Sequence, residues 1–169
     1  MSTKRIFFAL WPDNRQRDRL HAPISRLANL VEGRMVHRGN WHVTTVFIGS
    51  FPDTDIPELL ARAARIPVES FRLRFDRVEF WARPKVASLV AQTVPSELQR
   101  LVDAQSALLT DFGVRAEDRS YRPHITVARK ARPFESQRLA QPVVIEWTGF
   151  ELVESISRPG GATYHPLKQ

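Results

Sequence analysis

The stretch WHVTTVFIG (41–49) holds a histidine, His42, followed two residues later by Thr44, and the stretch RPHITVARK (122–130) repeats this His-x-Thr pattern. Both stretches are rich in β-branched residues, which predicts two strands. Because successive side chains of a strand point to opposite faces, each histidine is expected to share a face with its threonine. The repetition therefore predicts two strands that each present an imidazole beside a hydroxyl group.

In the second copy the pair is His124 and Thr126. One imidazole can take a proton from a nucleophile while the other gives a proton to a leaving oxygen, as acid–base chemistry at a phosphate requires. A single strand histidine is more often a structural residue with a satisfied hydrogen bond. Two copies in similar surroundings instead predict that His42 and His124 are catalytic and that Thr44 and Thr126 donate hydrogen bonds to phosphate oxygens.

The composition is that of an ordinary globular protein, with 43% apolar and 25% charged residues in a chain of 169. This length favours one domain with a sizeable core. The chain has no cysteine, which excludes disulfides and thiolate metal sites and is compatible with the cytoplasm, where we expect the protein. No apolar run of about 18 residues is present, so we expect no membrane span, and the apolar start is predicted to be a strand.

The net charge is +7, from 25 Lys and Arg residues against 18 Asp and Glu residues. A basic surface favours an anionic partner, and the planar guanidinium group of arginine matches phosphate oxygens well. The same charge could simply keep the surface soluble. We expect a phosphate-bearing partner.

Hydrophobic periodicity predicts an alternation of strands and helices. The expected strands cover residues 5–12, 35–36, 41–49, 70–83, 85–92, 122–130 and 142–155, with a hairpin turn at Gly160 and Gly161 into 162–167. The expected helices cover 13–31, interrupted near Pro23, 52–65 and 95–112, with a short turn or helix at 134–139. The shared order of the two halves indicates a duplicated α+β unit. We expect a single domain (1–169) of two similar lobes facing each other across a cleft, each with one His-x-Thr strand.

Four stretches of the chain resemble one known family: RIFFALWPD (5–13), GRMVHRGNWHVTTVFIGSF (33–51), RPHITVARK (122–130) and GATYHPL (161–167). The doubled motif is similar to that of the 2H phosphoesterase superfamily, and its flanks to the RNA 2′,3′-cyclic phosphodiesterase group, also called 2′-5′ RNA ligases. The resemblance implies a bilobal α+β fold, in which two pseudo-symmetric antiparallel sheets carry helices on the outside and enclose a central cleft. It also implies metal-independent hydrolysis of a 2′,3′-cyclic phosphate to a 2′-phosphate, with an RNA or nucleotide bearing that end as partner and no cofactor.

The resemblance assigns the role of proton donor to His42 and that of proton acceptor to His124, whereas the two motifs themselves are nearly symmetric and do not distinguish the roles. It also implies an arginine at the phosphate, which is Arg129 in this chain. Arg129 lies five residues after His124, so strict alternation places it on the opposite face of the strand. Either a bulge or the strand end turns it back to the site, or Lys130 serves instead.

Phe47 and Tyr121 are candidates for stacking on a nucleobase, although a structural role is the commoner one for such residues. No cysteine, H-E-x-x-H pattern or acidic cluster lies beside either histidine, which argues against a metal site. The G-x-S-x-G pattern of serine hydrolases is also absent.

Two alternatives remain open from the residues. The protein could bind RNA ends or nucleotides without catalysis, or it could perform the same chemistry on another cyclic or 2′-5′ linked nucleotide. Binding alone does not require two proton-transfer groups, so we favour the enzyme. We expect it to act as a monomer without association with a membrane.

Overall fold

The computed structural model describes residues 1–115, 117 and 119–168. The strands are β1 (Thr3–Leu10), β2 (Arg34–Met35), β3 (Val43–Pro52), β4 (Phe71–Trp81), β5 (Val86–Ala91), β6 (His124–Arg129), β7 (Gln137–Trp147), β8 (Glu151–Arg158) and β9 (Gly161–Leu167). The helices are α1 (Asn14–Leu27), α2 (Ile56–Ala63) and α3 (Ser96–Thr110), with short 3₁₀ turns η1 (Arg38–Asn40) and η2 (Asp53–Asp55). In this part of the chain no helix combines the length and apolar character that crossing a membrane requires.

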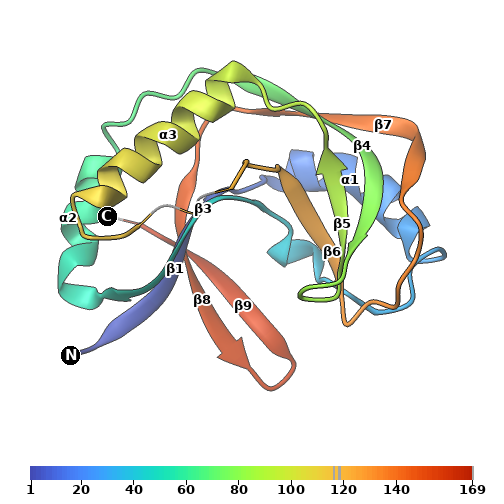
Figure 1. Ribbon diagram of the computed structural model, residues 1–169, viewed down its shortest axis with the longest axis horizontal. Coiled ribbons are helices and arrows are strands. Elements are labelled where there is room, and N and C mark those ends of the chain that lie inside the picture. Colours follow the sequence, from blue (N-terminus) through green and yellow to red (C-terminus); the bar gives the residue numbers. More distant parts are fainter. Residues whose placement is uncertain (116, 118, 169) are drawn as a thin grey trace.

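The strands form two antiparallel sheets (Figure 1), with strand orders β3-β1-β8-β9 and β2-β6-β5-β4-β7. The four strands of the first sheet correspond in order to β6, β5, β4 and β7 of the second. In the first sheet the motif strand β3 pairs with β1, and helix α1 lies between these two strands in the sequence. In the second sheet the motif strand β6 pairs with β5, and helix α3 lies between them in the sequence. The expectation of two pseudo-symmetric antiparallel sheets is confirmed, and each sheet supplies one motif strand.

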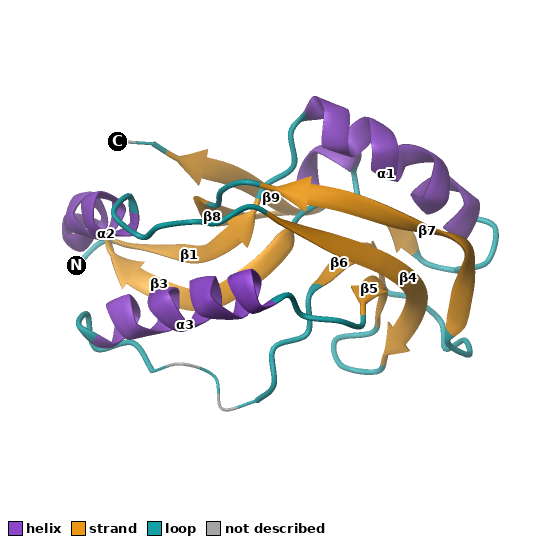
Figure 2. Ribbon diagram, turned by 90° about the horizontal axis from the view of Figure 1, so that it is seen from above, coloured by secondary structure: helices purple, strands orange, loops and turns teal. Residues whose placement is uncertain are grey.

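The two halves of the sequence do not, however, fold as separate lobes. The C-terminal hairpin β8–β9 completes the first sheet, and the short strand β2 from the N-terminal half joins the edge of the second. The helices are exchanged as well, because α1 packs beside β7 and α3 beside β3 (Figure 2). One continuous cluster of buried apolar side chains includes residues of both sheets. The repeat in the sequence is therefore a repeat of elements that are interleaved in space.

Several predicted elements have different bounds in the structure. The predicted strand 142–155 is two strands, β7 and β8, which belong to different sheets. The predicted turn or helix at 134–139 is wrong, because 134–136 have no regular structure and 137–139 begin β7. Pro142 is tolerated in β7 because β7 is an edge strand of its sheet. Strand β3 continues to Pro52, so α2 begins only at Ile56.

Pro23 lies inside α1 and does not interrupt it, contrary to expectation. A proline removes one intrahelical hydrogen bond. The helix is held instead by its buried face, formed by Leu20, Ile24 and Leu27, and by a capping box at Asp13. The predicted hairpin between β8 and β9 is confirmed, with Arg158 paired with Gly161 at its end.

Candidate active site

Both motif histidines stand at the start of their strands and are anchored in the same way. His42 directly precedes β3, and His124 is the first residue of β6. Nδ1 of His42 lies 2.8 Å from the carbonyl oxygen of Asn40, and Nδ1 of His124 lies 2.8 Å from that of Arg122. Since a carbonyl only accepts, each Nδ1 carries a proton and donates it to this bond. In the neutral imidazole this leaves Nε2 without a proton and available for acid–base chemistry.

The threonines share a face with their histidines, as predicted. Thr44 Oγ1 lies 3.1 Å from His42 Nε2, close enough for a hydrogen bond. Thr126 lines the same cavity as His124. All four side chains are half-buried. Each threonine hydroxyl can therefore reach either its imidazole or a bound group.

A bulge in β6 determines where Arg129 points. Two successive residues of β5 pair with Thr126 and Ala128, so Val127 is an extra residue on β6. One extra residue reverses the alternation of side chains beyond it. Arg129 consequently returns to the face of His124 and lines the cavity. Of the alternatives weighed from the sequence, the bulge is the one that the structure supports.

Strand β3 contains an equivalent bulge. Two successive residues of β1 pair with Thr44 and Val46, so Thr45 is the extra residue. The bulge turns Phe47, which lies five residues after His42, back toward the cavity that it lines. The side chain of Phe47 is 41% exposed. Phe47 and Arg129 thus occupy equivalent positions of the two motifs.

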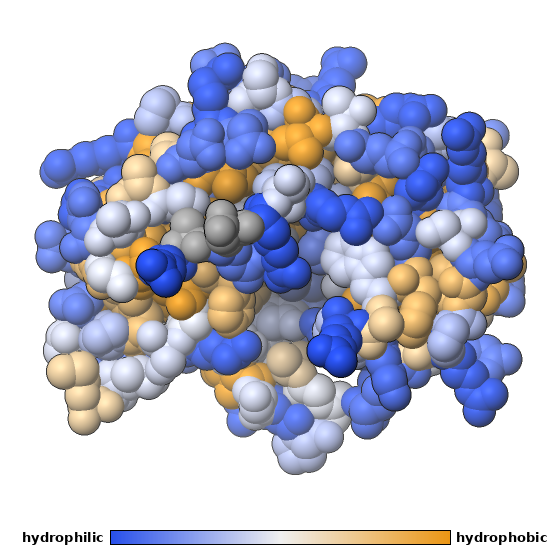
Figure 3. Space-filling view, viewed as in Figure 1, coloured by the Kyte–Doolittle hydropathy of each residue, from blue (hydrophilic) through white to orange (hydrophobic). Residues whose placement is uncertain are grey.

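The cavity between the two sheets has a volume of about 560 Å³ and brings most of the predicted site together. Of the predicted residues its lining includes Thr44, Phe47, Tyr121, His124, Thr126 and Arg129. His42 adjoins it through Thr44, whereas Lys130 is exposed beyond the end of β6 and does not line it. Figure 3 shows a hollow near the centre of this face of the molecule, with hydrophilic side chains around it.

Burial is the largest influence on the charge of both imidazoles. The pKa of His42 is lowered to about 4, chiefly by burial, with the hydrogen bond to Asn40 opposing and positive charge on His124 and Arg129 contributing to the lowering. Burial also lowers the pKa of His124, and the cationic Arg122 acts in the same direction. Both imidazoles are therefore neutral near pH 7 in the protein alone. A bound phosphate, being negative, raises both pKa values.

Aromatic side chains that the sequence did not single out pack around the two imidazoles. Trp11 stacks on His42 with ring centroids 5.8 Å apart, and Tyr164 stands edge-on to it at 5.0 Å. Trp81 meets His124 edge-on at 4.3 Å. The only sequence signal for the two tryptophans is their position at or just beyond the end of a strand.

Two hydrogen-bonded contacts hold the walls of the cavity. The Tyr121 hydroxyl donates to the carbonyl of Thr44 at 2.9 Å, which ties the segment before β6 to β3, and burial raises the pKa of Tyr121. Glu79 accepts hydrogen bonds from Arg122 at 2.8 Å and from Trp81 Nε1 at 3.0 Å. Burial tends to raise the pKa of Glu79, but these bonds outweigh it and the pKa is lowered.

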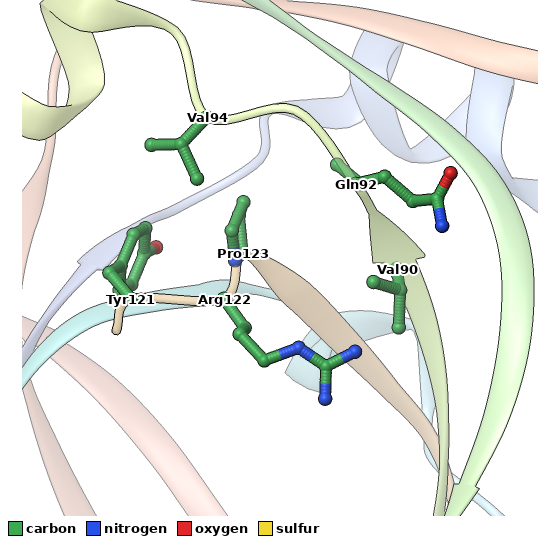
Figure 4. A pocket seen from close by; sticks show the side chains of 7 residues that line it. Val90, Gln92, Val94, Tyr121, Arg122 and Pro123 are labelled. Atoms are coloured by element: carbon green, nitrogen blue, oxygen red, sulfur yellow. The ribbon is translucent and has the colours of Figure 1, made fainter. Parts of the chain in front are cut away.

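A smaller cavity of about 140 Å³ lies between the end of β5 and the segment before β6 (Figure 4). Its lining includes Val90, Val94 and Pro123, and Tyr121 and Arg122 form part of both cavities. Its one charged group, Arg122, is already bonded to Glu79. His124 and both motif threonines line the larger cavity.

The chain is similar to several known proteins. Residues 10–91 match the family model described as LigT like Phosphoesterase. The sequence is 30% identical to the RNA 2′,3′-cyclic phosphodiesterase of Escherichia coli K12 over 81% of this chain and 78% of that protein. It is 24% identical to the protein of the same name from Archaeoglobus fulgidus over 97% and 98% of the two chains. The fold matches the crystal structure of E. coli LigT complexed with 3′-AMP with a TM-score of 0.86, at 27% identity over 99% of this chain and 97% of that one.

Proposed function

Because this chain belongs to the LigT-like phosphoesterase family, we propose that it hydrolyses a 2′,3′-cyclic phosphate at an RNA end to a 2′-phosphate. The observation that carries the proposal is the matched pair of imidazoles at one cavity, each with Nδ1 anchored by a carbonyl two residues earlier. An RNA-end binder would not need two such proton-transfer groups. The names of the related proteins support the same substrate.

In the proposed reaction a water molecule attacks the phosphorus in line with the ribose 3′ oxygen. Nε2 of His124 takes a proton from the water as its oxygen bonds to phosphorus. The bond from phosphorus to the 3′ oxygen breaks, and Nε2–H of His42 gives its proton to that oxygen. One imidazole gains a proton and the other loses one, so proton exchange with solvent restores the site. The assignment of the two roles follows the likeness to the family.

Thr44, Thr126 and Arg129 would hold the non-bridging oxygens. Their hydroxyl and guanidinium groups converge on the cavity and stabilise the negative charge that builds up on phosphorus-bound oxygens. The negative charge of the phosphate also acts on His42, which must be protonated to serve as the acid. Burial of His42 opposes that protonation, and an anionic phosphate favours it. Substrate binding thus prepares the acid.

We also propose that no metal ion takes part. Within residues 1–115, 117 and 119–168 no three His, Asp or Glu side chains are grouped closely enough to hold one. The protein's own imidazoles, hydroxyls and guanidinium supply the proton transfer and the charge stabilisation.

The product of a 2′,3′-cyclic nucleotide or a short RNA with that end tests the proposal. Phosphorus NMR should show a 2′-phosphate with the wild-type protein and unchanged substrate with His42→Ala. A predominantly 3′-phosphate product would mean that the 2′ oxygen leaves and that the assigned acid is wrong. Binding of the cyclic end without any turnover would favour the non-catalytic alternative.

A further inference from the structure

One rim of the cavity gathers exposed cations from three separate segments of the chain. Arg34 of β2 is the register partner of Arg129 at the end of β6. The backbone N–H of Ala131 donates to the carbonyl of Lys85 at 3.0 Å, which fastens the β4–β5 turn against the end of β6 (Figure 1). Lys130 lies between these contacts. Arg83, in the same turn, lines the cavity. The name basic rim is used below for Arg34, Arg83, Lys85 and Lys130, all of which are exposed.

The basic rim has no counter-charge among the described residues. None of its four cations forms an ion pair with a described carboxylate, and Arg34 donates only to the carbonyl of Gly160, at 2.8 Å. Two other arginines that line the cavity differ. Arg119 is paired with Glu117 at 2.9 Å, and Arg122 with Glu79 at 2.8 Å. The basic rim is therefore a group of unneutralised positive charges where the β4–β5 turn meets the end of β6.

This arrangement works against stability. Like charges at directly opposed positions of paired strands repel each other, as Arg34 and Arg129 do here. Lys85 and Lys130 both have positive φ angles, 67° and 50°, in a region that side-chain-bearing residues adopt at a conformational cost. Folding energetics alone would favour neutral or acidic residues and Gly or Asn at these places. The cations fit instead a ligand that brings negative charge.

We propose that the basic rim binds the phosphodiester backbone of the RNA that leads to the cyclic end, an inference that rests on the proposed function. A 2′,3′-cyclic phosphate terminates its strand, so the rest of the RNA leaves the site in one direction only, on the 5′ side of the reacting nucleotide. A group of unpaired cations beside the cavity matches a strand that leaves the site in a single direction. The enzyme therefore acts on RNA ends in preference to cyclic mononucleotides.

The test compares a cyclic mononucleotide with a hexanucleotide that ends in the same cyclic nucleotide. The variant Arg34→Gln/Lys85→Asn removes two rim charges. Gln retains a donor for Gly160, Asn tolerates the positive φ of residue 85, and neither residue lines the cavity. The matched control, Arg100→Gln/Arg132→Gln, removes two exposed arginine charges that are already paired with Glu69 and Glu32.

The rim variant should lower kcat/KM for the hexanucleotide by about 10-fold at low salt and leave the cyclic mononucleotide within about twofold. Loss of two phosphate contacts should also reduce the slope of log(kcat/KM) against log salt by about 1.4 for the hexanucleotide. The control variant should leave kcat/KM unchanged for both substrates. Equal effects of the rim variant on the two substrates, or an equal loss in the control, would overturn the proposal. If the double variant does not fold, Lys85→Asn alone should give half the change in slope.

Binding separates this proposal from the proposed function. If the wild-type protein opens neither cyclic substrate, the proposed function fails. The affinity for a labelled RNA hexamer with a terminal phosphate, measured by fluorescence anisotropy, then tests the basic rim. The rim variant should bind this RNA more weakly than the control variant. Identical affinities of the two variants would refute the rim.

Discussion

The Tyr164 hydroxyl accepts a hydrogen bond from Nη2 of Arg129 at 3.1 Å, so the C-terminal hairpin reaches across to the motif strand of the other sheet. The ring of the same tyrosine stands edge-on to His42. Tyr164 therefore connects the guanidinium proposed to hold the phosphate with the imidazole proposed as the acid.

Tyr164→Phe should keep the ring against His42 and release Arg129. Loss of one hydrogen bond of this kind should lower kcat/KM by roughly 3- to 10-fold, mainly through KM. Steady-state kinetics on a cyclic nucleotide would measure it. In an Arg129→Gln background the further effect should be small, because the two residues act through one contact. Fully additive effects would show that Tyr164 acts independently of Arg129.

His42→Ala and His124→Ala should each reduce kcat by about 10²–10⁴-fold, since each removes one proton-transfer group. The double variant should be little worse than either single one, as expected for residues that act as a unit. His21→Ala, which removes an exposed histidine of α1, is the matched control and should retain full activity. Near-normal turnover in either motif variant would exclude the catalytic pair.

The pH dependence of kcat/KM should be bell-shaped, because one imidazole must be neutral and the other protonated. Burial lowers the pKa values of both histidines in the free enzyme, so the maximum should lie on the acid side of pH 6.5. The two apparent values belong to the pair and not to one residue each. The profile of kcat, which reports the substrate complex, should shift to higher pH because the phosphate raises both pKa values. A kcat profile on the acid side of the kcat/KM profile would contradict this electrostatic picture.

Burial of His42 should also make stability depend on pH. Its pKa is about 4 in the folded protein against about 6.5 for an unperturbed histidine, so between these values the unfolded chain binds more protons. The free energy of unfolding should consequently fall as the pH is lowered through this window, by at most about 3 kcal/mol from this group. Urea denaturation at pH 7 and pH 4 should show a smaller loss for His42→Gln than for the wild type. Equal losses would mean that His42 titrates normally.

Activity should survive chelation. Hydrolysis measured in excess EDTA should equal that of the untreated protein, because the proposed proton transfers and charge stabilisation come from side chains alone. Loss of activity that a divalent cation restores would require a metal in the reaction.

Local sequence patterns were sufficient for the motif strands and for the pairing of each histidine with its threonine. They failed where distant strands decide the outcome. Arg129 reaches the site because β5 pairs across Val127 and leaves it as a bulge, and no property of residues 124–129 alone reports that pairing. The division of 142–155 into strands of two sheets has the same origin. Trp81 and Tyr164 were missed because they approach the histidines only through the tertiary fold.

The order of strands in the first sheet also bears on when the protein can become active during synthesis. β1 lies between β3 and β8, so one edge of β1 has no partner strand until residues 151–158 have been synthesised. Tyr164, which faces His42, follows on the next strand. A nascent chain that already contains both His-x-Thr motifs still lacks the strands that cover one of them. The first sheet, and with it the surroundings of His42, can therefore be completed only after residues 151–167 have been synthesised.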